Sequence, residues 1–343
     1  MTTDERIEAF STLGAKILNR KNLNELSSLC YLEQNTYLSN SWFIPQFVGN
    51  MLDAIGKSLT KSDLRKWLSQ YPDIENVYHK TVAVIMAGNI PLVGFHDFLS
   101  VLISGHKIKV KLSSDDKDLL PAIAKILCEI EPRFVDRIEF TDGFLKDFDA
   151  VIATGSNNSA RYFDYYFGKY PNVIRRNRNS AVVIHGNETD IELKALADDI
   201  FLYFGLGCRN VSQIYIPENY DVHNLFASFI AYEFIKFNSK YMNNYDYFKS
   251  IFLVNSEPFL DNEFVMMIEK PELASRISVL HLIRYQSFDE AKMQLLAKQN
   301  ELQCVVTKTE IEGLRCVGFG QTQSPALHDY ADGVDTMKFL TSL

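Results

Sequence analysis

The residue best suited to covalent chemistry in this chain of 343 residues is Cys208. It follows Gly205 and Gly207, which allow the backbone to bend closely around a ligand. It precedes Arg209, whose positive charge favours the thiolate form of a neighbouring cysteine. A thiolate is the natural nucleophile for thioester chemistry, because it exchanges one sulfur for another at small cost and is reactive near neutral pH. The residues alone leave two interpretations open, a reactive thiol and a small buried hydrophobic side chain.

Two short loops follow apolar runs and are candidates for ligand binding. They are Gly88-Asn89-Ile90-Pro91, after the run 81–87, and Thr154-Gly155-Ser156, at the end of the run 150–154. Ligands of open α/β sheets bind beyond the carboxyl ends of the strands, where a helix N-terminus offers free N–H groups to a phosphate. Neither loop matches the GxGxxG fingerprint, and no GxxxxGK[ST] motif occurs, so a simple turn is the default interpretation of each loop.

The histidines and a short basic run point less clearly to chemistry. His96 falls in a predicted helix and is expected to be an interior, hydrogen-bonded side chain. No spacing assigns a role to His185 or His328. The basic run 175–179 is expected to be a solvated turn, with a contact to a phosphate or a carboxylate as the alternative.

The elements that position these residues are predicted to alternate between strands and helices. Residues 1–75 are expected to be helical, with Ser62 as one helix cap. Strands are predicted at 81–87, 107–112, 150–154, 181–185, 212–216, 277–283 and 304–307, and helices at 92–103, 118–130, 156–166, 191–203, 222–238 and 289–299. This order is typical of right-handed crossover units, so the predicted fold class is α/β with parallel sheets.

Composition and charge exclude several classes of protein. Apolar residues make up 47% of the chain, which suffices for a sizeable core. Lys and Arg number 35 against 43 Asp and Glu, a net charge of −8 that argues against a nucleic-acid partner. No apolar run reaches the roughly 18–20 residues of a membrane span, and the acidic start lacks the features of a signal peptide. The five scattered cysteines form no CxxC pair, which predicts a reduced, cytoplasmic protein without disulfides or a metal site.

Four segments occur in an order that resembles the aldehyde dehydrogenase superfamily. They are 85–92, 105–113, 153–156 and 205–208, and the segment 284–307 is similar to a later strand and helix of that superfamily's catalytic domain. The closer similarity is to the acyl-CoA reductase branch, typified by the fatty acid reductase of bacterial luminescence. It runs from about Trp42 to the C-terminus and is carried by segments 88–92, 204–210 and 318–321.

The resemblance implies an aldehyde dehydrogenase-like fold, in which a Rossmann-like cofactor domain accompanies an α/β catalytic domain. We expect N-terminal helices and the dinucleotide-binding domain in residues 1–180. The catalytic domain with the nucleophilic Cys208 is expected in residues 181–320, and residues 321–343 are expected to return to the core. No β-hairpin arm for oligomerisation is recognised, so a homo-oligomer is left open.

The resemblance further implies that a nicotinamide cofactor reduces an acyl thioester to an aldehyde. Cys208 would attack the thioester carbonyl, release coenzyme A and hold the acyl group until hydride reaches that carbon. The side-chain amide of Asn89 and the backbone N–H of Cys208 match the superfamily's oxyanion donors, which stabilise charge on the carbonyl oxygen as it develops. The leading hypothesis is a reductase of medium or long acyl chains.

Cofactor-binding residues follow from the same resemblance. Lys111 matches the lysine that reaches the adenine ribose, and Ser156 matches the serine beside the pyrophosphate. Ser113 and Gly155, in the same two segments, complete the expected set. Ser114 stands where many relatives have a glutamate that binds the ribose 2′-hydroxyl. The absence of this glutamate favours NADPH. NADH is the alternative, because two aspartates follow at positions 115 and 116.

A second departure from the superfamily bears on the reaction. Hydrolytic aldehyde dehydrogenases carry a glutamate before the catalytic cysteine that activates water. The equivalent stretch here, 174–178, contains no carboxylate, so water attack should be slow and the acyl group can persist. Two alternatives remain beside the reductase. One is an acyl transferase or thioesterase that uses the same cysteine, and the other is a non-catalytic scaffold for an acyl-processing partner, such as an acyltransferase or a synthetase.

Overall fold

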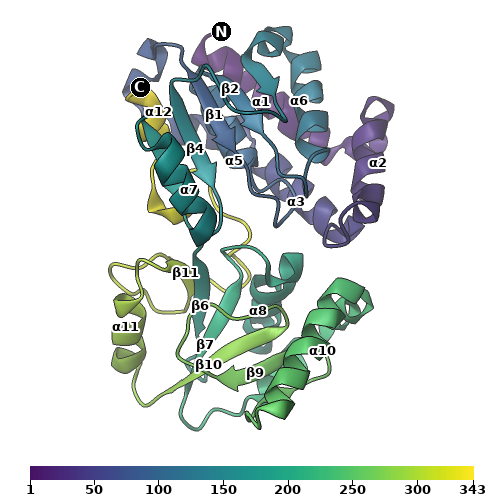
Figure 1. Ribbon diagram of the computed structural model, residues 1–343, viewed down its shortest axis with the longest axis vertical. Helices are drawn as coiled ribbons and strands as arrows, with labels where there is room; N and C mark the ends of the chain where they lie inside the picture. The colour runs from purple at the N-terminus through teal and green to yellow at the C-terminus, as the bar shows by residue number, and fades with distance from the viewer. The chain divides into compact units, whose positions relative to one another are not determined.

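The computed structural model describes residues 1–343, except for the side chains of Glu25, Asn76 and Asn157. The chain forms two compact units. The first comprises residues 1–176 together with 326–343, and the second comprises residues 177–325. Each unit has its own sheet, and the segment after residue 326 belongs to the same unit as the N-terminus (Figure 1).

Within the described residues, the first unit contains a sheet of five parallel strands in the order β3-β2-β1-β4-β5. The central strand β1 is buried along its middle, as expected of a parallel sheet that is covered on both faces. The chain runs outward from β1 to β3 and then returns to the other side of β1, so the strand order reverses between β1 and β4. The strands are β1 (Thr81–Ile85), β2 (Lys107–Lys111), β3 (Ile138–Phe140), β4 (Ala150–Thr154) and β5 (Asn172–Arg175).

Helices precede this sheet and connect its strands. Helix α4 begins after Thr60, whose side-chain oxygen accepts a hydrogen bond from the Asp63 N–H at 3.1 Å. The prediction that Ser62 caps this helix is wrong, because Thr60 has the extended backbone of an N-cap and Ser62 lies inside the helix. The α-helices of the first unit are α1 (Thr3–Leu18), α2 (Ser27–Asn35), α3 (Pro45–Ser58), α4 (Lys61–Leu68), α5 (Phe95–Ile103), α6 (Leu119–Ile130), α7 (Asn157–Phe167) and α12 (Thr336–Thr341).

The second unit is built on a seven-stranded sheet in the order β12-β11-β6-β7-β10-β9-β8 within the described residues. The β8–β9 pair is antiparallel and the other pairs are parallel. The strands are β6 (Asn179–Val183), β7 (Val211–Pro217), β8 (Leu260–Asp261), β9 (Met266–Glu269), β10 (Val279–Tyr285), β11 (Leu302–Val306) and β12 (Cys316–Val317), and the α-helices are α8 (Asp190–Phe201), α9 (His223–Ser228), α10 (Ser239–Val254) and α11 (Phe288–Ala297).

Short 3₁₀ helices complete the two units. The helix predicted at 222–238 is instead the short α9 followed by the 3₁₀ helix η7. The 3₁₀ helices are η1 (Arg20–Asn22), η2 (Asn24–Leu26), η3 (Thr36–Leu38), η4 (Pro72–Asn76), η5 (Pro132–Arg137), η6 (Leu202–Gly205), η7 (Ile230–Phe237) and η8 (Ala331–Gly333).

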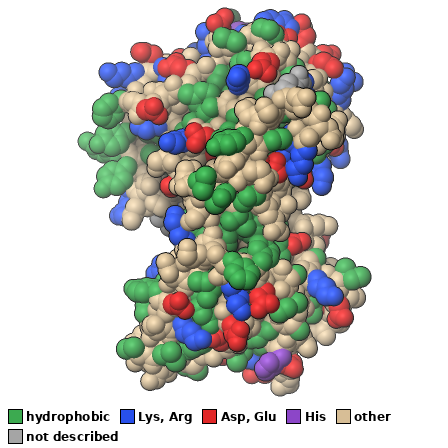
Figure 2. All heavy atoms as spheres, turned by 90° about the vertical axis from the view of Figure 1, so that its right-hand side faces the viewer, with side chains coloured by type: hydrophobic (Ala, Val, Ile, Leu, Met, Phe, Trp, Pro, Cys, Tyr) green, Lys and Arg blue, Asp and Glu red, His purple; other side chains and the backbone are tan. Residues whose placement is uncertain are grey.

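The helices and one face of the surface were searched for membrane-spanning length and for clustered charge. No helix among the described residues is both long enough and apolar enough to span a membrane. On the face of the molecule drawn in Figure 2, basic and acidic side chains are interspersed.

Residues 326–343 are tied into the first unit by buried and half-buried polar contacts. His96 Nε2 lies 2.8 Å from the carbonyl oxygen of Leu327, and the Trp67 indole N–H donates to the Tyr330 hydroxyl at 2.7 Å. His106 Nε2 lies 2.9 Å from another carbonyl oxygen of this segment, in helix α12. The prediction that His96 is hydrogen-bonded is confirmed, although its side chain is half-buried and not fully interior.

A buried ion pair lies at the end of β5. The two terminal nitrogens of Arg175 lie 2.5 and 2.8 Å from the carboxylate oxygens of Asp97, in helix α5. Arg175 is 4% exposed and also donates to Thr336 Oγ1 at 2.8 Å. The expected solvated turn is therefore wrong for Arg175, because β5 continues to this residue and directs its side chain inward. The alternative, a contact with a carboxylate, is confirmed.

We expect the substitution Asp97→Ala to destabilise the first unit by about 3–5 kcal/mol, because it leaves a buried guanidinium without its counter-charge. The matched control is Asp164→Ala, which removes the partner of the neighbouring, exposed Arg176, at 3.1 Å. That change should stay within about 1 kcal/mol. The two tryptophans of the chain, Trp42 and Trp67, both lie in the first unit, so urea unfolding followed by tryptophan fluorescence measures this unit. Equal shifts for the two variants would contradict the prediction.

Candidate functional site

The predicted cofactor-binding residues and Asn89 lie at the carboxyl ends of three neighbouring strands of the first unit or in the loops that follow them. Asn89 follows β1, Ser113 follows β2, in which Lys111 is the last residue, and Gly155 and Ser156 follow β4. These strands are adjacent and parallel, so the three loops emerge at the same end of the sheet, the carboxyl ends of its strands (Figure 1). The strand order reverses between two of these strands, β1 and β4. The carboxyl ends of the strands at such a reversal are the usual ligand-binding position of an open α/β sheet.

The loop that carries Asn89 is held by the turn after β2. A Cβ atom on Gly88 would lie 2.5 Å from the Ser113 Oγ, so only glycine fits there. Asp116 Oδ2 accepts a hydrogen bond from the Leu92 N–H at 2.6 Å. Leu92 has a φ angle of 54°, which is strained for a residue with a Cβ atom. Burial raises the pKa of Asp116 to about 6, although the Leu92 N–H acts to lower it.

The third loop leads directly into helix α7. Ser156 caps this helix, because its Oγ accepts a hydrogen bond from the Ser159 N–H at 3.2 Å. A Cβ atom on Gly155 would lie 2.9 Å from the Ser159 Cβ, which explains the glycine. A helix N-terminus at this end of the sheet suits a phosphate group. At the end of β2, Lys111 Nζ donates to the Gly143 carbonyl at 3.1 Å.

Cys208 lies in the second unit, in the loop between η6 and β7. Its side chain is half-buried. The preceding η6 contains three residues in the left-handed region, since Tyr203, Phe204 and Gly205 have φ angles of 56°, 56° and 72°. Such a conformation is strained for the two aromatic residues and persists only where the surroundings hold it.

The side chain of Asn210 stabilises this conformation, because it forms hydrogen bonds with backbone groups that precede Cys208 in the chain. Its Nδ2 donates to the carbonyl oxygens of Ile200 and Leu202, at 3.3 and 2.9 Å, where the chain leaves α8. Its Oδ1 accepts a hydrogen bond from the Gly207 N–H at 2.8 Å. Asn210 is 2% exposed, so these bonds are shielded from water.

Two further buried side chains support the same region. Ser180 Oγ, in β6, donates to the Cys208 carbonyl at 3.1 Å. The fully buried Asp199 accepts hydrogen bonds from the Gly320 and Thr322 N–H groups, at 2.6 and 2.9 Å. Burial raises the pKa of Asp199 to about 6, while these two N–H groups act to lower it. Asp199 thereby ties the loop that follows β12 to the helix that leads toward Cys208.

Sequence reasoning missed Asp199 and Asn210. Asp199 lies three residues after Leu196 on the buried face of α8, and an acidic side chain on an apolar helix face is a signal that could have identified it. Asn210 carries no comparable signal, because its partners are backbone carbonyls that only the folded loop brings together.

The electrostatic surroundings of the Cys208 loop include two arginines. Burial lowers the pKa of Arg315, and the positive charge of Arg209 lowers it further. Arg209 and Arg315 are therefore close enough in space to interact electrostatically.

A cavity of about 180 Å³ adjoins this loop within the second unit. Its wall includes loop residues 205–207 and both apolar and polar side chains, among them Phe204, Tyr241, Arg178 and Arg276. Among the described residues, no group of three or more His, Cys, Asp or Glu side chains is arranged to hold a metal ion.

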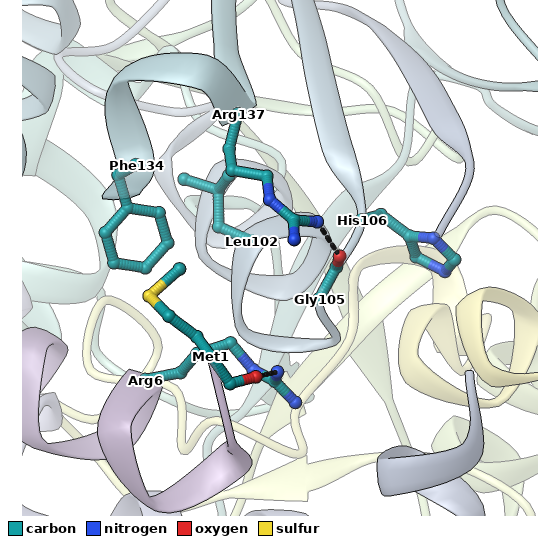
Figure 3. A pocket seen from close by; sticks show the side chains of 7 residues that line it. All are labelled: Met1, Arg6, Leu102, Gly105, His106, Phe134 and Arg137. Atoms are coloured by element: carbon teal, nitrogen blue, oxygen red, sulfur yellow. Dashed lines mark hydrogen bonds between the residues drawn. The ribbon is translucent and has the colours of Figure 1, made fainter. Parts of the chain in front are cut away.

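The pocket drawn in Figure 3 lies elsewhere in the first unit and contains none of the predicted site residues. Arg6 donates to the Met1 carbonyl and Arg137 to the Gly105 carbonyl, at 2.7 and 2.6 Å. Since these cations already bind backbone oxygens that close the fold, we assign this pocket a structural role.

We expect Asn210→Ala to lower the free energy of unfolding of the second unit by about 1–3 kcal/mol, because it leaves buried carbonyl and N–H groups unpaired. Asn244→Ala, on α10, is the matched control and should change stability by less than about 0.5 kcal/mol. Urea unfolding followed by circular dichroism measures both variants. An Asn210→Ala protein as stable as the control would show that the loop does not depend on this side chain.

Comparisons with known proteins identify a family profile and a curated relative that match this chain. The sequence profile described as acyl-CoA reductase (LuxC) matches residues 24–246, more than half of the chain. A long-chain acyl-protein thioester reductase of Photorhabdus laumondii is 21% identical over 188 residues, which cover 50% of this chain and 39% of that relative. The chain therefore spans about two fifths of the length of this curated relative.

Solved structures show the fold. Aldehyde dehydrogenase 21 of Physcomitrella patens has a TM-score of 0.67 at 13% identity, covering 100% of this chain and 84% of that one. An aldehyde dehydrogenase of Bacillus cereus, solved as its NAD⁺ complex, has a TM-score of 0.61 at 15% identity, covering 90% of this chain and 72% of that one. The predicted fold and resemblance are confirmed, and the chain belongs to the acyl-CoA reductase (LuxC) family of oxidoreductases with the aldehyde dehydrogenase fold.

Proposed function

We propose that the chain is an NADPH-dependent acyl-CoA reductase, which converts an acyl thioester to an aldehyde through an acyl group held on Cys208. The observation that carries this proposal is the half-buried Cys208 in a strained loop braced by Asn210, in a member of a reductase family. In this proposal the first unit binds the cofactor and the second unit performs the covalent step, in the cytoplasm.

The first covalent step belongs to Cys208. Its thiolate forms a bond to the thioester carbonyl carbon, the bond from that carbon to the leaving sulfur breaks, and the released thiolate takes up a proton. After reduction, the bond between carbon and Cys208 breaks, the aldehyde leaves, and the cysteine returns as a thiolate.

Oxyanion stabilisation is assigned to Asn89 and to the Cys208 N–H. Charge develops on the carbonyl oxygen when sulfur attacks, and a fixed N–H donor lowers the barrier at that moment. The exposed Asn89 stands at the tip of a loop that is anchored through Gly88 and Leu92. Such anchoring suits a donor that must not reorganise during the reaction.

The residues at the carboxyl ends of these strands of the first sheet fit a nicotinamide dinucleotide. Helix α7 presents its N-terminus there, next to Ser156, which suits a pyrophosphate. Lys111 supplies a cation at the end of β2, which suits the adenine ribose and its phosphate. When bound, the reduced cofactor supplies the hydride that turns the acyl carbon into an aldehyde carbon.

Water attack on the acyl group is expected to be slow. Residues 174–178, which replace the water-activating glutamate of hydrolytic relatives, contain no carboxylate. Asp97, which does approach this stretch, is bound by both terminal nitrogens of Arg175. A carboxylate in a bidentate pair is a poor general base, so the acyl group can persist for reduction.

The proposed substrate is a medium- or long-chain acyl-CoA or another acyl thioester. The relative from Photorhabdus laumondii carries the name of a long-chain acyl-protein thioester reductase. A protein that carries or transfers the acyl group, such as an acyltransferase or a synthetase, is therefore a proposed partner as well.

We expect Cys208→Ser to abolish covalent labelling by radioactive acyl-CoA and to stop NADPH oxidation, because the serine hydroxyl is a far weaker nucleophile. Cys316→Ser, at another half-buried cysteine of the same unit, is the matched control and should keep both activities. Acid formed without NADPH oxidation would support a thioesterase instead. Neither labelling nor NADPH oxidation in the unmodified protein would support a scaffold.

We expect Ser114→Glu to raise the KM for NADPH by roughly tenfold, the equivalent of about 1.4 kcal/mol, because a carboxylate repels the 2′-phosphate. The KM for NADH should not rise, since that cofactor offers a hydroxyl at this position. Ser114→Gln, of similar size without the charge, is the control. Initial rates with each cofactor measure the effect, and an equal rise for both cofactors would contradict the proposed NADPH preference.

A further inference from the structure

We propose that Asp116 is a positioning residue that fixes Asn89 from the cofactor side of the loop. The inference rests on the proposed function, since it concerns the reaction in which Asn89 takes part. In this proposal Asp116 contacts neither the substrate nor the cofactor.

The first argument is the burial of a carboxylate without full pairing. Asp116 is 7% exposed, and its Oδ1 is buried with no hydrogen-bond partner among the described side chains and backbone. Its Oδ2 accepts the Leu92 N–H at 2.6 Å. A buried carboxylate is unfavourable unless its hydrogen bonds compensate, so a side chain that only filled space here would be apolar. What the carboxylate adds is its hold on the backbone of Leu92, with a second and weaker interaction from the Leu119 N–H.

The second argument is the conformation that this bond holds. Leu92 has a φ angle of 54°, and the two residues that flank Pro91, Ile90 and Leu92, are buried, whereas Asn89 is exposed. The loop thus has an anchored base and an exposed tip. Without the hydrogen bond to its N–H, Leu92 is expected to return to a negative φ angle, because most residues with a Cβ atom avoid the left-handed region.

The third argument is that one turn holds both ends of the loop. Ser113 lies against Gly88, where a Cβ atom would approach its Oγ to 2.5 Å. The turn is braced internally, because the Asp115 N–H donates to the Ser113 Oγ and the Asp116 N–H to the Ser113 carbonyl, both at 3.2 Å. The turn lies just after Lys111 and includes Ser113, so the same turn borders both the proposed cofactor-binding segment and the Asn89 loop.

Kinetics of a double-mutant cycle test the inference. We measure NADPH oxidation with acyl-CoA for Asp116→Ala, Asp116→Asn and their combinations with Asn89→Ala. Asp116→Ala should lower kcat by about 10- to 100-fold, as a displaced catalytic group does, and change the KM for NADPH by less than about twofold. Asp116→Asn should recover most of kcat, because its amide oxygen still accepts the Leu92 N–H. In the Asn89→Ala background, Asp116→Ala should have no further effect.

Asp118→Asn is the matched control, since it removes a neighbouring exposed carboxylate and should leave kcat unchanged. If Asp116→Ala does not fold, Asp116→Leu replaces it, because leucine fills the space without accepting a hydrogen bond. An equal loss of kcat with and without Asn89 would overturn the inference. Failure of the proposed function is distinguished by the unmodified protein, which would then neither become acylated on Cys208 nor oxidise NADPH.

Discussion

The parallel pairing of β1 with β2 on one side and with β4 on the other is the constraint on which the first unit depends. Ile85 is paired with Lys111 and with Ala153, so the three strands end at the same level. Parallel strands cannot be joined by tight turns, so the chain must leave this end of the sheet through separate loops and return by a helix. The loops that carry Asn89, Ser113 and Gly155 are therefore neighbours because of backbone hydrogen bonds in the sheet.

Irregular loops need an outside source of hydrogen bonds, and in both units a buried polar side chain supplies it. Asp116 binds the backbone of the Asn89 loop, Asn210 binds the backbone that precedes Cys208, and Asp199 binds the loop after β12. Each side chain is unfavourable to bury by itself. Each is retained where backbone N–H or carbonyl groups would otherwise lie unpaired in the interior, which is the larger loss.

The sequence allowed the central strands to be predicted, because the runs 81–87 and 150–154 are apolar and end in glycine-containing loops. The residues Asn89 and Cys208 could be selected from their loops, although their chemical roles stay predictions. The partner of Arg175 could not be predicted, since Asp97 lies 78 residues away in the sequence and only the folded sheet joins them. Helix α10 was not predicted, because its many Asn, Tyr and Phe residues have modest helix propensity.

The return of residues 326–343 to the first unit makes that unit discontinuous in the chain, which bears on its assembly during synthesis. The second unit is one continuous segment, so all of its strands are available once residue 325 has left the ribosome. The first unit, although most of it is translated earlier, still lacks the Tyr330 hydroxyl for Trp67 and the Thr336 hydroxyl for Arg175 at that stage. The first unit therefore cannot complete these contacts until residues 326–343 are available, whereas the second unit needs no segment from outside residues 177–325.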